Sequence, residues 1–170
     1  PGQWTTSQMR ERIYGRRFRY DASGLSMPAS KSFAQRAILA AALAEGCSHL
    51  DGYSPCGDSE AAIAAAEALG AKVGRENGGR TLAIEAAKNG IRADRIDTGE
   101  SGLLTRLMIP VLAAAGRGDC LVEGRGTLLN RPLNSAADIM AAFGVLLSNA
   151  GDRQGKEVFV PVRVRGRLIP

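Results

Sequence analysis

Extended and helical segments alternate along this chain, and their order recurs with a period of about 72 residues. From residue 17 to about 88 the hydrophobic pattern predicts strand, helix, strand, helix and two final strands. The same order returns from about 93 to 168, and Gly52 and Gly124 occupy equivalent points 72 residues apart. We therefore predict an α/β protein that contains two copies of one βαβαββ unit.

The elements of the two units can be placed from their hydrophobic periods and turn residues. In the first unit we expect helices at 30–45 and 59–69. We expect strands at 18–22, 48–51, 71–75 and 81–86. An Asn77-Gly78-Gly79 turn joins the last two strands. In the second unit we expect elements at 95–98, 101–115, 120–123 and 134–149, followed by strands between 157 and 164.

The helices and the final strand have opposite hydrophobic patterns, which predicts how the layers are arranged. Residues 37–44 are apolar on every side of a helix and 61–66 are nearly so, as expected for helices buried all round. In the last strand Val162 and Val164 alternate with arginines, which is the period of a sheet with one wet face. We therefore expect buried helices with outer sheets, the inverse of a doubly wound fold.

The net charge of +5 is concentrated at one end of the chain. Residues 1–20 carry five arginines and one glutamate, a net charge of +4, so the other 150 residues carry only +1. These 150 residues are nearly neutral, so they lack the excess of positive charge that binds the phosphate backbone of nucleic acid. We interpret 1–16 as a basic lead-in. The alternative is a non-catalytic module whose Arg-rich arm binds RNA or a protein partner while the repeats serve as scaffold.

Composition excludes several other classes of protein and site. No apolar run approaches the ~20 residues that a membrane span needs, and the start lacks a signal-peptide pattern, so we expect a cytoplasmic protein without membrane partners. The three cysteines, Cys47, Cys56 and Cys120, are far apart and accompany a single histidine. This excludes a disulfide framework and a zinc site, and we expect buried thiols and no metal or cofactor.

Polar groups gather where the first predicted helix begins, in the stretch Pro28-Ala29-Ser30-Lys31-Ser32. Ser30 or Ser32 can cap this helix, and Lys31 stands at its positive end. Ser32, Gln35 and Arg36 share one face. Free amides, a hydroxyl, an ammonium and a guanidinium suit a phosphorylated ligand, whereas the alternative is a capped helix with solvated charges.

Two further clusters lie in the second unit. The stretch Gly99-Glu100-Ser101-Gly102 precedes a helix that carries Arg106, and its glycines allow a ligand to approach exposed amides. The stretch 124–132 contains Arg125, Thr127 and Arg131 and could bring a guanidinium to an anion. A structural turn and a polar surface loop explain these two stretches about equally well. At the second helix of the first unit, Asp58 or Ser59 is a natural cap.

These three stretches, in this order and at these separations, resemble the 3-phosphoshikimate 1-carboxyvinyltransferase (EPSP synthase) family. The resemblance rests on Pro28 to Ser32 with Gln35-Arg36-Ala37, on Gly99 to Gly102 with Arg106, and on Gly124 followed by Asn130-Arg131-Pro132. It covers 17–170, which we expect to be a partial synthase-like domain. The family fold is built from βαβαββ units with buried parallel helices, as expected above from the residues alone.

The resemblance implies roles for particular residues. Lys31, Ser32 and Arg36 would bind shikimate 3-phosphate, with Lys31 also touching phosphoenolpyruvate, and the Gly102 amide would bind the phosphate of phosphoenolpyruvate. The sequence departs from the family at Glu100, where many members have Asn, and at Leu103, where many have Thr. The position where the family usually has an Arg for phosphoenolpyruvate aligns with Thr127, which leaves Arg125 or Arg131 as substitutes.

The resemblance also limits what the chain is expected to do alone. Family members have six such units, and their acid and base residues lie beyond the stretch that this chain matches. We therefore expect the N-terminal part of a synthase, with no catalytic residue of its own, that needs the remaining part for carboxyvinyl transfer. A fragment of the UDP-N-acetylglucosamine enolpyruvyl transferase is the alternative enzyme. That family has Lys-Asn at the first helix, where this chain has Lys31-Ser32.

Overall fold

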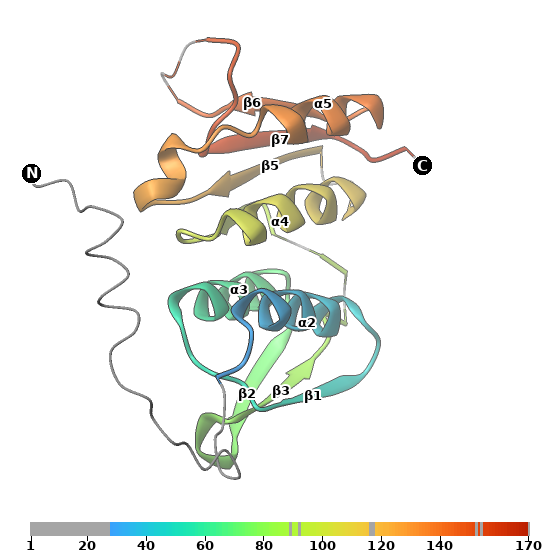
Figure 1. The fold of residues 1–170 in the computed structure, drawn as a ribbon. Helices are drawn as coiled ribbons and strands as arrows, with labels where there is room; N and C mark the ends of the chain where they lie inside the picture. The colour runs from blue at the N-terminus through green and yellow to red at the C-terminus, as the bar shows by residue number, and fades with distance from the viewer. Residues whose placement is uncertain are drawn as a thin grey trace, which may run out of the picture.

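The computed structural model describes residues 28–88, 90–91, 93–115, 118–151, 153 and 155–169. The predicted strand 18–22 and the basic lead-in 1–16 lie outside this range. Between two sheets lie helices α2 (Lys31–Leu43), α3 (Gly57–Ala68) and α4 (Gly102–Ala115), as Figure 1 shows. This arrangement confirms the predicted α/β class with helices inside and sheets outside.

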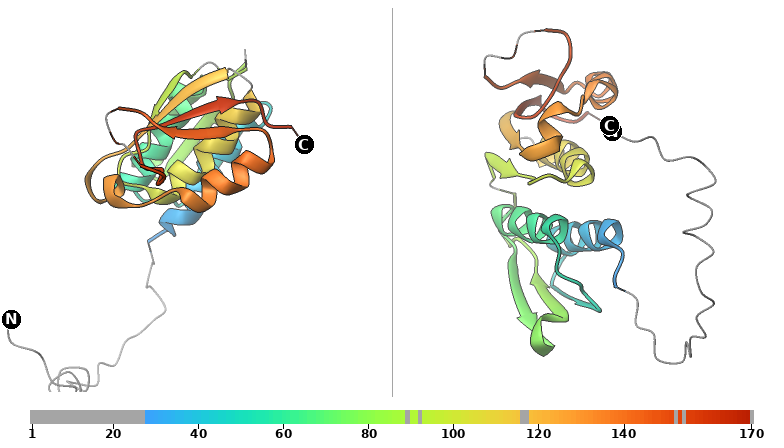
Figure 2. Two further views of the ribbon diagram at one scale, coloured as in Figure 1. Left: turned by 90° about the horizontal axis from the view of Figure 1, so that it is seen from above. Right: turned by 60° about the vertical axis from the view of Figure 1, so that its left-hand side comes forward.

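The first unit is a three-stranded antiparallel sheet covered by two helices. The sheet has the order β1-β3-β2, formed by β1 (Cys47–Asp51), β2 (Lys72–Glu76) and β3 (Thr81–Glu85). Helices α2 and α3 lie side by side on it, as the right-hand view of Figure 2 shows. The short 3-10 helix η2 (Asn77–Gly79) turns β2 into β3, and its three residues all have positive φ, which glycine and asparagine tolerate best.

Within the described residues, the second unit repeats this plan with one more strand in its sheet. Its sheet has the order β4-β5-β7-β6, with β4 (Arg95–Asp97) parallel to β5 (Gly118–Glu123). The remaining pairs are antiparallel and involve β6 (Leu146–Asn149) and β7 (Val162–Gly166). Val162 and Val164 are buried against α4, while the arginines between and beyond them face outward, as their alternation predicted.

One helix ends seven residues earlier than its sequence predicted. Helix α5 (Asn134–Ala142) stops before Gly144, and residues 146–149, expected to be helical, form β6 instead. Gly144 has φ 80°; its N–H donates to the Ala141 carbonyl, and the next N–H, of Val145, donates to the Met140 carbonyl. This is a Schellman motif, which ends a helix in the left-handed region.

The same motif ends the equivalent helix of the first unit. Gly70, with φ 105°, follows α3, and its N–H donates to the Glu67 carbonyl while the Ala71 N–H donates to the Ala66 carbonyl. Each unit therefore sends its second helix into its next strand through the same glycine turn. Gly144, which occupies the place of Gly70 in the second unit, is the sequence signal from which the end of α5 could have been predicted.

A Gly144→Ala substitution tests this helix end. We expect the free energy of unfolding to fall by about 1–2 kcal/mol, because alanine is strained at positive φ. Gly57→Ala is the matched control, since Gly57 begins α3 without positive φ and a methyl group there meets no atom within 4 Å. Urea denaturation followed by circular dichroism measures both changes. Equal stabilities for the two variants would contradict the assignment.

Two expectations about burial were wrong in part. Helix α2 buries Ile38, Leu39, Ala41 and Ala42 but leaves Phe33 71% and Leu43 46% exposed, so it is not covered on every side by the described residues. Of the three cysteines only Cys120 is buried, whereas Cys47 is exposed and Cys56 is half-buried. An apolar composition shows that a helix can be covered on all sides, but it does not show what covers it.

Candidate functional site

The first helix start brings together residues from two helices. The Ser30 hydroxyl caps α2 by accepting the Phe33 N–H at 3.4 Å, as its sequence predicted. Lys31 is the first residue of the helix, and its Nζ lies 3.0 Å from a carboxylate oxygen of Asp58, in the first turn of α3. The Lys31 side chain is 67% exposed, so its ammonium is accessible to a ligand despite this ion pair.

The start of α3 is capped by a cysteine and not by Asp58 or Ser59. Cys56 is the N-cap residue, and its N–H donates to the buried Ser59 hydroxyl at 3.0 Å in a reciprocal capping box. The Ser59 hydroxyl, 3.3 Å from the Cys56 sulfur, lowers the pKa of the thiol, and the backbone N–H groups of Ser59 and Asp58 act in the same direction. Asp58 is thereby left to pair with Lys31.

The second helix start is tied to α2 by a buried hydrogen bond. The Ser101 hydroxyl caps α4 by accepting the Leu104 N–H at 3.2 Å, and it donates to the Gln35 side-chain oxygen at 2.8 Å. Gln35 is 1% exposed and Ser101 is 3% exposed. Because a buried polar group without a partner is costly, this pair fixes the two units relative to each other. The sequence marked Gln35 as polar but did not indicate its partner.

The turn before α4 holds the loop that follows β5. Gly99 has φ 61°, and its carbonyl accepts the Arg125 N–H at 2.8 Å. The Glu100 carboxylate accepts the Thr127 N–H at 3.3 Å, where the 3-10 helix η3 (Gly126–Asn130) begins. Arg125 also forms an ion pair with Asp97 at 3.6 Å. The second and third predicted clusters are therefore one connected structure.

Two arginines lie against Gly102. The Arg106 guanidinium donates to the Gly102 carbonyl at 2.9 Å, and the Arg131 guanidinium donates to the Thr127 hydroxyl at 3.3 Å. A methyl group on Gly102 would lie 3.1 Å from Arg106 Nη1 and 3.6 Å from Arg131 Nη1. Both guanidinium groups thus meet at the first residue of α4.

A cavity of about 440 Å³ joins the first helix start to the second unit. Its lining brings Lys31, Glu100 and Arg125 together with Cys56, Gly57, Asp58 and Gly99. The other predicted site residues do not line this cavity. Ser32 and Arg36 lie along α2, with Arg36 exposed, while Gly102, Arg106, Thr127 and Arg131 form the neighbouring group around the start of α4.

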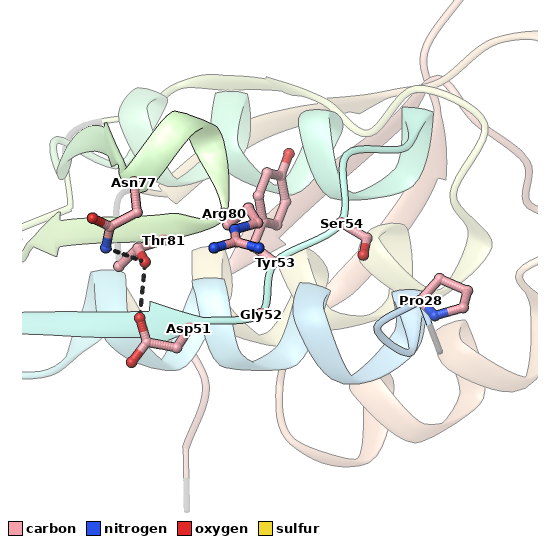
Figure 3. Close-up of a pocket in the computed structure, with 8 residues that line it drawn as sticks. All are labelled: Pro28, Asp51, Gly52, Tyr53, Ser54, Asn77, Arg80 and Thr81. Atoms are coloured by element: carbon pink, nitrogen blue, oxygen red, sulfur yellow. Dashed lines mark hydrogen bonds between the residues drawn. The ribbon is translucent and has the colours of Figure 1, made fainter. Parts of the chain in front are cut away.

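A larger cavity of about 850 Å³ lies where the hairpin of the first sheet turns (Figure 3). There the Asn77 amide donates to the Thr81 hydroxyl, which donates to the Asp51 carboxylate at 2.8 Å. None of the residues predicted to bind a ligand lines it, and three of its polar residues, Asp51, Asn77 and Thr81, are hydrogen-bonded to one another. We therefore place the candidate site at the smaller cavity and at Gly102.

The Cys56 thiol offers a chemical probe of this site. Because its pKa is lowered, we expect alkylation by iodoacetamide to reach half its maximal rate at a lower pH in the folded chain than in urea. Site-resolved mass spectrometry measures the rate, with Cys56→Ser as the control for peptide assignment. Identical pH profiles in the folded and unfolded chain would contradict the proposed environment of the thiol.

Neither a metal centre nor a membrane span is found in the part of the chain that the structure describes. No three metal-binding side chains come together there, and no helix combines the length and apolar character needed to cross a bilayer.

Comparison with known proteins agrees with these features. The sequence profile of EPSP synthase (3-phosphoshikimate 1-carboxyvinyltransferase) matches residues 22–168. The chain is 32% identical over 147 residues to the 3-phosphoshikimate 1-carboxyvinyltransferase of Koribacter versatilis, and 35% identical over 143 residues to that of Anaeromyxobacter dehalogenans. These alignments cover 85% and 84% of this chain but 33% and 31% of the relatives.

Solved structures give the same result. The EPSP synthase of Acinetobacter baumannii superposes on 84% of this chain and 31% of its own length, with a TM-score of 0.72 and 26% identity. The chain therefore spans about a third of the length of the relatives that it matches. Within that span, it belongs to the EPSP synthase (3-phosphoshikimate 1-carboxyvinyltransferase) family.

Proposed function

We propose that this chain supplies part of the anion-binding cleft of an enolpyruvyl transferase. The complete enzyme would transfer the carboxyvinyl group of phosphoenolpyruvate to the 5-hydroxyl of shikimate 3-phosphate and release phosphate. The observation that carries the proposal is a cavity that brings Lys31, at the start of α2, together with Gly99, Glu100 and Arg125, next to the start of α4. Such an arrangement suits two phosphorylated substrates that must meet.

Lys31 is the residue that we assign to both substrates. No acidic residue stands in the first turn of α2, so among the described residues the positive end of this helix is balanced by Asp58 from α3. A phosphate group carries more charge than a carboxylate and can displace Asp58 from the exposed ammonium. We assign Ser32 and Arg36 to shikimate 3-phosphate, because they follow Lys31 on the same helix and Arg36 forms no ion pair with any described residue.

The mechanism follows from the chemistry of the substrates. The 5-hydroxyl oxygen adds to C2 of phosphoenolpyruvate, the carbon that carries the phosphate, while C3 gains a proton, which gives a tetrahedral intermediate. Loss of phosphate from C2 and of a proton from C3 then restores the double bond. One group must therefore protonate C3, and another must remove the proton of the hydroxyl and later a proton from C3. The described residues of the cleft supply cations and amides that hold phosphate groups, and we assign the proton transfers to the remaining part of the synthase. Closure of that part over the cleft would exclude water.

We therefore expect the purified 170-residue chain to bind shikimate 3-phosphate without turning it over. Incubation with both substrates should release no phosphate above a protein-free blank, while a complete synthase assayed in parallel releases it. A colorimetric phosphate assay measures this. Turnover that disappears in the Lys31→Ala variant would show that the chain contains its own acid and base, and would overturn this part of the proposal.

A further inference from the structure

The connection between β1 and α3, residues 52–56, contacts both helix starts of the first unit. The Ser54 hydroxyl accepts the Ala29 N–H at 3.2 Å, two residues before Lys31. On the other side, the Ser54 carbonyl accepts the hydroxyl of Ser59, in the first turn of α3, at 3.4 Å. The position of this β1–α3 connection therefore affects how the starts of α2 and α3 lie relative to each other.

Tyr53 anchors the β1–α3 connection in the core of the first unit. The residue is 7% exposed, and its N–H donates to the Arg80 carbonyl at 3.0 Å, in the turn between β2 and β3. Its hydroxyl donates to the carboxylate of Glu60 on α3. Burial, followed by this hydrogen bond, raises the pKa of Tyr53, so the hydroxyl keeps its proton and remains a donor.

An ion pair holds the acceptor of the Tyr53 hydroxyl in place. Arg75 on β2 donates to both oxygens of Glu60, at 2.6 and 3.2 Å. Its guanidinium also lies 5.8 Å from the centre of the Tyr53 ring. The hydrogen bonds from Arg75, followed by that from Tyr53, lower the pKa of Glu60, which stays ionised. Because a bidentate pair fixes direction as well as distance, the three side chains tie the β1–α3 connection to α3 and to β2.

We propose that Tyr53 is a positioning residue for Lys31, and that it holds the starts of α2 and α3 where the Lys31 ammonium can bind a phosphate group. The proposal rests on the proposed function and adds to it a residue that does not line the smaller cavity. Tyr53 acts on α3 through Glu60 and on α2 through the neighbouring Ser54. A binding group that is already in place costs less free energy of ordering when the ligand arrives.

Tyr53→Phe tests this role, because it removes the hydroxyl and keeps the ring that packs in the core. Calorimetric titration should show shikimate 3-phosphate binding about 3–10-fold more weakly than to the wild type, since a small misplacement of a binding group is costly. Shikimate, which lacks the phosphate assigned to Lys31, should bind with unchanged affinity. Gly144→Ala is the matched control: it destabilises the end of α5, outside the candidate site, and should leave both affinities unchanged.

The Cys56 thiol reports on the β1–α3 connection in the absence of ligand. The Ser59 hydroxyl, which lowers the pKa of this thiol, is itself bonded to the Ser54 carbonyl. In Tyr53→Phe we therefore expect alkylation of Cys56 by iodoacetamide to reach half its maximal rate at a pH closer to the value in urea. Gly144→Ala should keep the wild-type profile, because a loss of stability alone does not alter the folded environment of the thiol.

Four results would overturn the positioning role. Wild-type affinity of Tyr53→Phe for shikimate 3-phosphate would do so and would leave the proposed function standing. Equal losses in Tyr53→Phe and Gly144→Ala would show that the effect comes from stability. Weaker binding with an unchanged Cys56 profile would show that Tyr53 does not act through the β1–α3 connection. If the wild-type chain binds no shikimate 3-phosphate, the proposed function fails, and the role of Tyr53 fails with it.

Discussion

A Lys31→Ala variant is expected to bind shikimate 3-phosphate about 10–100-fold more weakly than the wild-type chain, because it loses a charge-assisted hydrogen bond to phosphate. Its free energy of unfolding should change by less than about 1 kcal/mol. The variant loses the ion pair with Asp58, but the Lys31 side chain in that pair is mostly exposed to solvent. Calorimetric titration measures the affinity, and urea denaturation measures the stability.

Two further variants make this result specific. Lys72→Ala removes another exposed lysine, which faces Glu85 at the far end of the first sheet, and it should bind like the wild type. Asp58→Asn removes the carboxylate that competes with the phosphate for Lys31, and it should bind a few-fold more tightly. If Lys31→Ala and Lys72→Ala weaken the binding of shikimate 3-phosphate equally, the loss comes from the lower net charge, and Lys31 has no specific role.

A Gln35→Ala variant is expected to lose about 2–4 kcal/mol of stability. The substitution leaves a cavity beneath α2 and removes the acceptor of the buried Ser101 hydroxyl. A double-mutant cycle with Ser101→Ala isolates the interaction, for which we expect a coupling of about 1–2 kcal/mol. Additive losses in the cycle would contradict the role of this hydrogen bond in joining the two units.

Gln35→Ala should also weaken ligand binding although Gln35 does not line the cavity. The hydrogen bond to Ser101 fixes the start of α4 relative to α2, and a small misplacement of a binding group is costly. The loss should be smaller than in Lys31→Ala. A folded Gln35→Ala chain that binds at full strength would show that the cleft does not depend on this contact.

Most of the fold could be predicted from hydrophobic periods and turn residues. The starts of α2 and α4 fall within one residue of the predicted positions, because Ser30 and Ser101 carry strong capping signals. The end of α5 could not be placed from periodicity, since residues 146–149 are compatible with both helix and strand, and the positive φ of Gly144 decided the outcome.

The site was predicted less completely than the fold, because its geometry depends on contacts between units. The sequence marked Lys31, Gly102 and Arg131, but pairing Lys31 with Asp58 requires α3 to pack beside α2. Likewise, the ion pair of Arg125 joins it to Asp97, which lies 28 residues earlier in the sequence. Charges can be counted in a sequence, but their neutralisation by distant partners is visible only in the structure.

The central claim is that the start of α2 binds a phosphate group, and calorimetric titration of the wild-type chain tests it most directly. Shikimate 3-phosphate should bind at least about tenfold more tightly than shikimate, which lacks only the phosphate, and added salt should narrow this difference. Equal affinities for the two ligands, or no binding of shikimate 3-phosphate by a cooperatively folded chain, would contradict the account.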